Sequence, residues 1–263
     1  MTPMRPLVSI ITPTFEREQF LPQSLRLVRQ QTYPNIEWLI LDDSPQPSKM
    51  LNNCSDPRVS YEHISQRLTI GEKRNRLIEK ARGAIIAHFD DDDYYAPRFI
   101  DVMVSALENE SADFANLCSW YMYDFRHGLF GFWDLKTIVG IHYLCYRDQM
   151  RVVNITNENN ANLRENYQSY GFTYVYRRQV WEANPFPARN WGEDSDFVKA
   201  ARTKFRLTHI PDSTGLVLHT LHVNSSSSCF PQYRLPNFLL PELFPEYRAF
   251  FEQLTKEGAP ISR

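Results

Sequence analysis

Short apolar runs alternate with helical patterns through the first half of the chain. The runs over 7–13, 36–41, 59–64 and 84–89 are rich in β-branched and large apolar residues and end in polar or charged ones, which predicts strands. Apolar residues at helical spacing over 20–32, 71–83 and 97–107 predict helices, the second of them ending at Gly83. Such alternation favours an α/β fold with a mainly parallel sheet covered by helices.

The second half of the chain is less regular. Residues 118–176 mix aromatic and polar side chains without a clear period, so no elements are predicted there. A helix is expected over 192–205, a pair of strands over 207–210 and 216–218, and an amphipathic helix in the tail from Pro236, which carries Phe250, Phe251 and Leu254. Because no repeat or long linker divides the chain, we expect a single domain over 1–263.

Composition and charge exclude several classes of protein. With 43% hydrophobic residues the chain can bury a substantial core, and its net charge of −2 gives no basic field for nucleic acid. Charges or prolines interrupt every apolar run before it reaches the roughly 20 residues of a membrane-spanning helix, and the first apolar stretch is interpreted as a strand rather than a signal sequence. The four cysteines, Cys54, Cys118, Cys145 and Cys229, lie far apart, which favours a reducing, cytoplasmic setting.

Acidic residues follow two of the predicted strands directly. Asp42 and Asp43 come after 36–41, and four consecutive aspartates, Asp90, Asp91, Asp92 and Asp93, come after 84–89. Ligands of parallel sheets bind beyond the carboxyl ends of the strands, so both groups are expected at that edge. Adjacent carboxylates repel one another, and a divalent cation with a preference for oxygen ligands, Mg²⁺ or Mn²⁺, removes the repulsion. The alternative, which is compatible with a metal site, is that Asp92 or Asp93 caps the helix that begins near Pro97.

The segment ARGAIIAHFDDDDYYAP resembles the strand and DxD motif of the family-2 glycosyltransferases of the GT-A fold. The resemblance implies a nucleotide-diphospho-sugar transferase fold with a smaller, mixed acceptor-side region. It aligns Asp90 and Asp92 with the first and last acids of the motif, makes Asp92 the principal ligand of Mn²⁺ or Mg²⁺, and leaves Asp91 to the nucleotide sugar. By the same resemblance the single domain has a nucleotide-binding half over 1–93, an acceptor-binding half over 94–235 and a helical tail over 236–263.

Two upstream segments are similar to the donor-binding part of that family. PLVSIITPTFER resembles the first strand and the nucleotide-binding turn, with Pro13, Thr14 and Phe15 in place and Glu16 where Asn is common. IEWLILDDSP resembles the second strand, and the resemblance implies that Asp43 recognises the base. In GEKRNRLIEKARG the match gives Arg74 a contact with the base or the phosphates. The alternative for this residue is an ordinary solvated charge on the helix.

Downstream, NWGEDSDF resembles the ED motif that begins a helix beneath the acceptor, which makes Asp194 the catalytic base, with Glu193 and Asp196 as substitutes. A carboxylate placed there can take the proton of the acceptor hydroxyl. Acidic residues in a first turn are also favoured by the helix dipole alone. HTLHVN offers His222 or His219 to the metal or diphosphate. Because residues three apart on a strand face opposite sides, only one of the two can serve.

Together these matches imply a metal-dependent, inverting hexosyl- or N-acetylhexosaminyltransferase. Its donor would be a nucleotide-diphosphate sugar, with a UDP-sugar favoured, and its acceptor a saccharide or a lipid-linked saccharide in surface polysaccharide or glycan assembly. The terminal helix would suit peripheral association with the inner face of a membrane. A nucleotidyltransferase would need a glycine-rich phosphate loop, which ITPTFER lacks, and a phosphatase would need DxDxT. A catalytically inactive carbohydrate-binding protein is the third alternative. Trp191 could stack on an acceptor sugar.

Overall fold

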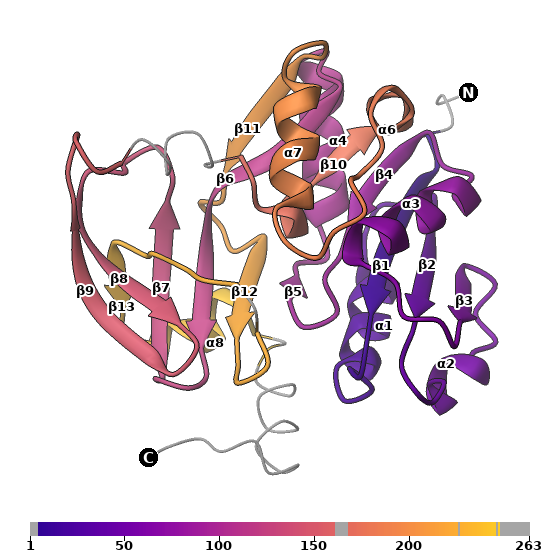
Figure 1. The fold of residues 1–263 in the computed structure, drawn as a ribbon, viewed down its shortest axis with the longest axis horizontal. Helices are drawn as coiled ribbons and strands as arrows, with labels where there is room; N and C mark the ends of the chain where they lie inside the picture. Colours follow the sequence, from indigo (N-terminus) through magenta and orange to yellow (C-terminus); the bar gives the residue numbers. More distant parts are fainter. Residues whose placement is uncertain (1–4, 161–167, 226, 246, 248–263) are drawn as a thin grey trace. The chain divides into compact units, whose positions relative to one another are not determined.

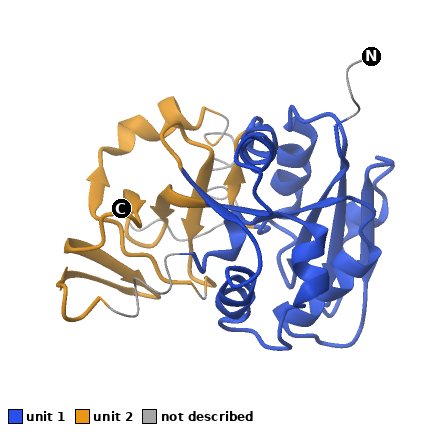
Figure 2. Cartoon of the chain, turned by 90° about the horizontal axis from the view of Figure 1, so that it is seen from above, with its two compact units in different colours: residues 1–91, 97–116, 168–210 blue, residues 92–96, 117–167, 211–263 orange. Residues whose placement is uncertain are grey.

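A computed structural model describes residues 5–160, 168–225, 227–245 and 247. The chain forms two compact units, shown in Figure 2. Unit 1 comprises residues 1–91, 97–116 and 168–210, and unit 2 comprises residues 92–96, 117–167 and 211–263. The boundary between the units therefore falls inside the run of four aspartates, and unit 1 gathers segments from well beyond residue 93.

Unit 1 is built on a mostly parallel sheet (Figure 1). Its strands are β1 (Val8–Thr14), β2 (Ile36–Asp42), β3 (Val59–His63), β4 (Ile85–His88) and β10 (Val175–Arg177), in the order β10-β4-β1-β2-β3. The strands β1, β2, β3 and β4 are parallel, and β10 is antiparallel to β4. β1, β2 and β4 are buried along nearly their whole length, which explains their continuous apolar sequences. The prediction of an α/β fold with four early strands is confirmed.

The described residues of unit 1 also form helices. They are α1 (Leu21–Gln30), α2 (Lys49–Asn52), α3 (Ile70–Lys80), α4 (Phe99–Asn109), α6 (Arg178–Ala183) and α7 (Glu193–Ala201), with a short 3₁₀ turn, η1 (Gly171–Thr173). Thr69 and Glu72 form a capping box that fixes the start of α3. The prediction that Gly83 ends this helix is wrong, because α3 stops at Lys80. Gly83 instead lets the chain pass close to β1, where an added Cβ would lie 2.6 Å from Ser9 Oγ.

One hydrophobic cluster of unit 1 joins the sheet to α3 and α7. Leu77 and Ile78 of α3 and Phe197 and Val198 of α7 are almost fully buried against sheet residues such as Ile86. The ring of Phe197 stacks on that of Phe186 with centroids 4.0 Å apart. Burial of side chains this large contributes about 1.5–3 kcal/mol each. Both helices are thereby anchored to the sheet.

Unit 2 contains the region in which no elements were predicted. β6 (Phe114–Asp124) begins in unit 1 and continues here, followed by β7 (Leu129–Asp134), the hairpin of β8 (Gly140–Tyr146) and β9 (Gln149–Ile155), and β13 (Tyr233–Leu235). The order β13-β7-β6 is antiparallel. β6 is buried at ten of its eleven positions, so both of its faces carry apolar or aromatic side chains and the alternation of a half-exposed strand is missing.

Two further strands occur where a strand pair was predicted, but their pairing is different. β11 (Leu207–Pro211) pairs with β6, and β12 (Val217–Leu221) pairs with β6 and with β5 (Tyr94–Tyr95). In the tail, the described residues form η2 (Asn237–Leu239) and α8 (Leu240–Leu243), whereas the predicted helix residues Phe250, Phe251 and Leu254 lie outside the described part. Among the helices of the described residues, none is long and apolar enough to cross a membrane.

Candidate functional site

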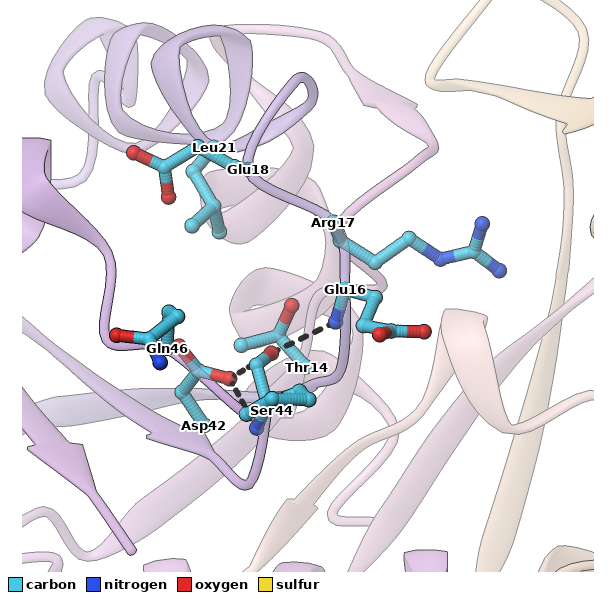
Figure 3. Close-up of a pocket in the computed structure, with 9 residues that line it drawn as sticks. Thr14, Glu16, Arg17, Glu18, Leu21, Asp42, Ser44 and Gln46 are labelled. Atoms are coloured by element: carbon cyan, nitrogen blue, oxygen red, sulfur yellow. Dashed lines mark hydrogen bonds between the residues drawn. The ribbon is translucent and has the colours of Figure 1, made fainter. Parts of the chain in front are cut away.

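A pocket of about 190 Å³ lies in unit 1 where β1 and β2 end (Figure 3). Its lining comes from the turn after β1, the first residue of α1 and the loop after β2: Thr14, Glu16, Arg17, Glu18, Leu21, Asp42, Ser44, Pro45 and Gln46. Parallel strands bind ligands at this edge. Of the residues predicted for the nucleotide sugar, Thr14 and Glu16 line the pocket, whereas Pro13 and Phe15 do not.

Hydrogen bonds from both strand ends fix the wall of this pocket. The Asp42 carboxylate accepts from the Ser44 backbone N at 2.9 Å and from the Tyr61 hydroxyl at 2.7 Å. Ser44 Oγ in turn accepts from the backbone N of Glu16 at 2.7 Å, a bond drawn in Figure 3. Glu16 has a φ of 53°, a left-handed conformation that a non-glycine residue rarely adopts. The hydrogen bond from Glu16 to Ser44, rather than the intrinsic backbone preference of Glu16, therefore stabilises the conformation of the turn after β1.

The Asp43 carboxylate is buried and points toward two cations. It accepts from Lys73 Nζ at 2.8 Å and from the Leu68 backbone N at 2.8 Å, and it pairs with Arg67. Burial raises the pKa of Asp43, but the bonds from Lys73, Leu68 and Arg67 outweigh it and hold that pKa below its usual value. The Arg67 guanidinium lies 3.4 Å from the centroid of the Phe15 ring. Asp43 and Phe15, predicted to contact the nucleotide, thus belong to one cluster with Lys73 and Arg67.

Arg74 forms a buried ion pair with Glu193, the first residue of α7. Both side chains are only 6% exposed, so Arg74 is not a solvated helix charge. Burial lowers the pKa of Arg74, but the negative charges of Glu193, Asp90 and Asp194 raise it above the usual value. Arg74 is therefore a fixed positive charge among three of the predicted site residues.

Asp194 lies beside this ion pair at the start of α7. Its carboxylate accepts from the Gly171 backbone N at 3.1 Å and from the Ser195 backbone N at 2.7 Å. Burial, and next the negative charge of Glu193, raise the pKa of Asp194 to about 6, although Arg74 and the two N–H groups act in the opposite direction. A carboxylate that titrates near neutrality can accept a proton from a hydroxyl more readily than an ordinary aspartate.

The four consecutive aspartates have separate partners. In unit 1, Asp91 accepts from Thr14 Oγ1 at 2.6 Å, and its backbone oxygen accepts from Ser24 Oγ at 2.8 Å. Asp90 also belongs to unit 1 and is partly buried. Asp91 therefore links the loop after β4 to the end of β1 and to α1, next to the pocket.

In unit 2, the other two aspartates each meet a different histidine. Asp92 Oδ2 lies 2.8 Å from His222 Nε2, and Asp93 Oδ2 lies 2.8 Å from His219 Nδ1. Burial lowers the pKa of His219, but the Asp93 carboxylate raises it well above the usual value. β12 ends at Leu221, so His219 lies on the strand and His222 follows it, and the strand argument for choosing between them does not apply.

The Asp92 carboxylate offers an oxygen donor that fits Mn²⁺ or Mg²⁺, and His222 places an imidazole nitrogen beside it. Within the part of the chain that the structure describes, no group of three His, Cys, Asp or Glu side chains could hold a metal ion. Mg²⁺ sites in nucleotide enzymes commonly take only one or two carboxylates and complete their shell with phosphate oxygens and water. The donor set therefore fits a cation that is held jointly with a diphosphate rather than by a protein cage.

Sequence analysis missed several residues of this site. Lys73, Arg67, Tyr61 and Gly171 were not singled out. The sequence could have indicated Lys73. It and Arg74 precede Leu77 by four and three residues, so all three lie on the same buried face of α3. Gly171 had no such signal, since its contact with Asp194 joins residues 23 positions apart.

Comparisons with known proteins show which family and fold this chain resembles. Residues 9–126 match the family described as glycosyl transferase family 2. WcaA of Escherichia coli (strain K12), provisionally named a colanic acid biosynthesis glycosyl transferase, is 33% identical over 104 residues, which cover 38% of this chain and 37% of WcaA. The chain thus spans little more than a third of that relative.

Two solved structures have a similar fold. S. aureus TarS 1-349 in complex with UDP-GlcNAc aligns with a TM-score of 0.61 and 16% identity, covering 84% of this chain and 60% of that one. The mannosyltransferase PcManGT from Pyrobaculum calidifontis, in complex with GDP-Man and Mn²⁺, aligns with a TM-score of 0.56 and 17% identity, covering 83% and 57%. The architecture is therefore that of the GT-A glycosyltransferases.

Proposed function

We propose that this chain, which belongs to glycosyl transferase family 2 through residues 9–126, transfers a sugar from a nucleotide-diphosphate donor to an acceptor hydroxyl. The observation that supports this reaction most directly is the Asp194 carboxylate, whose pKa is raised to about 6 beside the buried Arg74–Glu193 pair. A group poised near neutrality is suited to general-base work.

For the donor, we propose that the nucleoside occupies the edge of the sheet where β1 and β2 end. The pocket lined by Thr14, Glu16 and Asp42 lies there, and the cluster of Phe15, Asp43 and Lys73 is adjacent to it through the bond from Lys73 Nζ to the Thr14 backbone oxygen, 2.9 Å long. The similarity to TarS, crystallised with UDP-GlcNAc, favours a UDP-sugar. Arg67, more than half exposed and stacked on Phe15, is the side chain best placed to move when a base binds.

For the cofactor, we propose Mn²⁺ or Mg²⁺ held by Asp92 and His222, with Asp90 as the other acid of the motif. The fit of one carboxylate and one imidazole nitrogen to a cation shared with phosphate supports this assignment. Such an ion would neutralise the charge that builds on the departing diphosphate. PcManGT, of the same fold, was solved with Mn²⁺ and GDP-Man.

The proposed reaction is a single displacement with inversion. The acceptor oxygen bonds to the anomeric carbon as the bond from that carbon to the diphosphate oxygen breaks, and the diphosphate leaves with the bonding electrons. Asp194 takes the proton of the acceptor hydroxyl. Glu193 stays paired with Arg74, so it holds the first turn of α7 in place and leaves Asp194 as the carboxylate for the proton. The similarity to WcaA favours an acceptor in surface polysaccharide assembly, either a saccharide or a lipid-linked saccharide.

A panel of UDP-, GDP- and dTDP-sugars tests the proposal. The unchanged protein should be stabilised against heat by one nucleotide class in the presence of Mn²⁺ and should transfer or slowly hydrolyse the corresponding sugar. Asp194→Asn should keep donor binding and lose about 100- to 10,000-fold in transfer rate. If Asp194→Asn transferred at a near-normal rate while Asp92→Ala did not, the assignment of the base would be wrong. Stabilisation by none of the nucleotide sugars would contradict the proposed function itself.

A further inference from the structure

Trp191 is 66% exposed, which is unusual for a residue of its size. The chain has five tryptophans. Trp38, Trp120 and Trp133 are at most 2% exposed, and Trp181 is partly buried. Among the described residues of unit 1, Trp191 is also the only large hydrophobic side chain that is strongly exposed. Tryptophan is enriched at binding surfaces, and the exposed indole of Trp191 leaves a large aromatic face open to a ligand.

The loop that carries Trp191 is held on both sides, so its exposure does not come from a loose segment. Arg189 donates to the backbone oxygen of Gly192 at 2.8 Å and pairs with Asp196 of α7. The Asn190 side chain accepts from the Ile70 backbone N at 2.9 Å, at the start of α3.

Gly71 brings the same loop against α3. Its backbone N donates to the Arg189 oxygen at 3.2 Å, and a Cβ at position 71 would lie 1.9 Å from the Pro187 oxygen. Such a distance is incompatible with any side chain. The residues on either side of Trp191 are therefore fixed to α3 and α7, and the indole is presented to solvent from a rigid support.

Trp191 lies close in sequence to the proposed base, Asp194. It precedes Asp194 by three residues, and Gly192 between them has a φ of 75°, in the left-handed region that favours glycine. The chain turns at Gly192 so that Glu193 is buried with Arg74 while Trp191 stays outside.

We propose that Trp191 binds the acceptor, with the indole face stacked on the apolar C–H face of a pyranose ring, so that a ring hydroxyl faces Asp194. This inference rests on the proposed function and adds the residue that binds the saccharide acceptor, which also separates a saccharide from a polyol phosphate. A flat aromatic face matches the apolar face of a sugar ring. The cation on the same loop, Arg189, already pairs with Asp196, so the loop offers an apolar surface rather than a phosphate site.

Tryptophan fluorescence tests the binding directly, because Trp191 is the one tryptophan more than half exposed and all five lie in the described residues. The protein, with Mn²⁺ and the nucleoside diphosphate of its donor class, is titrated with methyl β-D-glucopyranoside, methyl β-D-galactopyranoside and methyl α-D-mannopyranoside. Glycerol 3-phosphate and ribitol 5-phosphate form the polyol arm. We expect at least one glycoside to protect the emission from acrylamide quenching, and this protection to vanish in Trp191→Phe. Protection by polyol phosphates alone, or by no compound, would overturn the inference.

Kinetics with the glycoside that binds separate acceptor binding from catalysis. Trp191→Ala should raise the acceptor KM by about tenfold while the donor KM and donor hydrolysis without acceptor change by less than about twofold. Trp191→Phe should fall between. Phe238→Ala, which removes an aromatic side chain 71% exposed in unit 2, serves as the control and should change neither. An unchanged acceptor KM in Trp191→Ala, or an equal loss of hydrolysis, would overturn the inference. Absence of donor binding in the unchanged protein would remove the proposed function and the inference with it.

Discussion

Buried ion pairs determine which carboxylates remain available for chemistry. Glu193 and Asp194 are neighbours, but only Glu193 forms an ion pair with Arg74. The charge of Arg74 lowers the pKa of Asp194 by less than burial and the charge of Glu193 raise it. In the same way Asp43 forms ion pairs with Lys73 and Arg67, whereas Asp42 lines the pocket. Which acid of each adjacent pair acts therefore depends on where the cations of the following helix and loop lie.

The raised pKa of Asp194 leads to a pH dependence. Only the carboxylate accepts a proton, so kcat should rise with pH and reach half of its plateau near the Asp194 pKa of about 6. Replacing Glu193 by Gln removes a negative charge that raises this pKa, and should move the acidic limb to lower pH. The measurement is kcat against pH at saturating donor and acceptor. An acidic limb at the same pH in both proteins would contradict this account of Asp194.

The Arg74–Glu193 pair should be important for stability. Arg74→Met leaves the Glu193 carboxylate buried without its partner and should lower the free energy of unfolding by about 3–5 kcal/mol. Arg74→Met combined with Glu193→Met should recover much of the loss, because no buried charge remains. The control is Arg76→Ala on the same helix, whose partly exposed pair with Glu62 should contribute no more than about 1 kcal/mol. Urea unfolding measures all four proteins, and equal losses for Arg74 and Arg76 would refute the prediction.

At the scale of elements, α3 connects the donor-side cluster with the proposed base. Its capping box fixes the start of the helix. Three residues near this start make distant contacts: Gly71 with the Trp191 loop, Lys73 with Asp43 and Arg74 with Glu193. A single helical turn thus reaches three parts of unit 1.

Gly71→Ala should disturb this connection. The methyl group would meet the Pro187 backbone oxygen, which is not a flexible side-chain end, so the loop over 187–192 must shift. We expect a lower melting temperature together with a change in the Trp191 emission. The control is Gly128→Ala, a position with a φ of 59° and open space around it, where only the backbone conformation opposes the substitution, by about 1–2 kcal/mol. An unchanged Trp191 emission in Gly71→Ala would show that the loop does not depend on α3.

At the scale of the whole molecule, each of the two compact units carries residues to which we assign a role. The pocket, Asp43 and Asp194 belong to unit 1, and Asp92 and His222 belong to unit 2. The segment that matches the family, 9–126, likewise includes residues of both units. Variants in both units are therefore needed to test the proposed function.

The proposed metal ligand of unit 2 can be tested against a matched histidine. His222→Ala should raise the Mn²⁺ concentration that gives half-maximal transfer by about tenfold or more, because a donor to the ion is lost. The control is His127→Ala, which removes another histidine of unit 2 bonded to a carboxylate, that of Asp124 at 2.9 Å. Titration of Mn²⁺ in the transfer assay, with direct Mn²⁺ binding as a second readout, measures the effect. Equal shifts in both variants would argue against His222 as a ligand.

The amino-acid sequence by itself determined the parallel core of unit 1 and the acids at its edge. β1, β2 and β4 are buried on both faces, so they are continuous apolar runs, and the polar residues that end them mark the carboxyl edge of the sheet. The start of α7 and its acidic first turn were also visible. These features are local, because the hydrophobic period of a helix or strand and the position of its end depend on a few neighbouring residues.

Only the tertiary structure decided which residues meet. In the structure, β11 and β12 pair with β6 rather than with each other, and Gly83 lies against β1. Arg74 pairs with Glu193, 119 positions away. His222 contacts Asp92, and His219 contacts Asp93. The strands of unit 2 also lacked a sequence signal, since β6 is covered on both faces. Contacts between distant segments depend on the packing of the whole core. The sequence around each contacting residue therefore shows no pattern that identifies its partner.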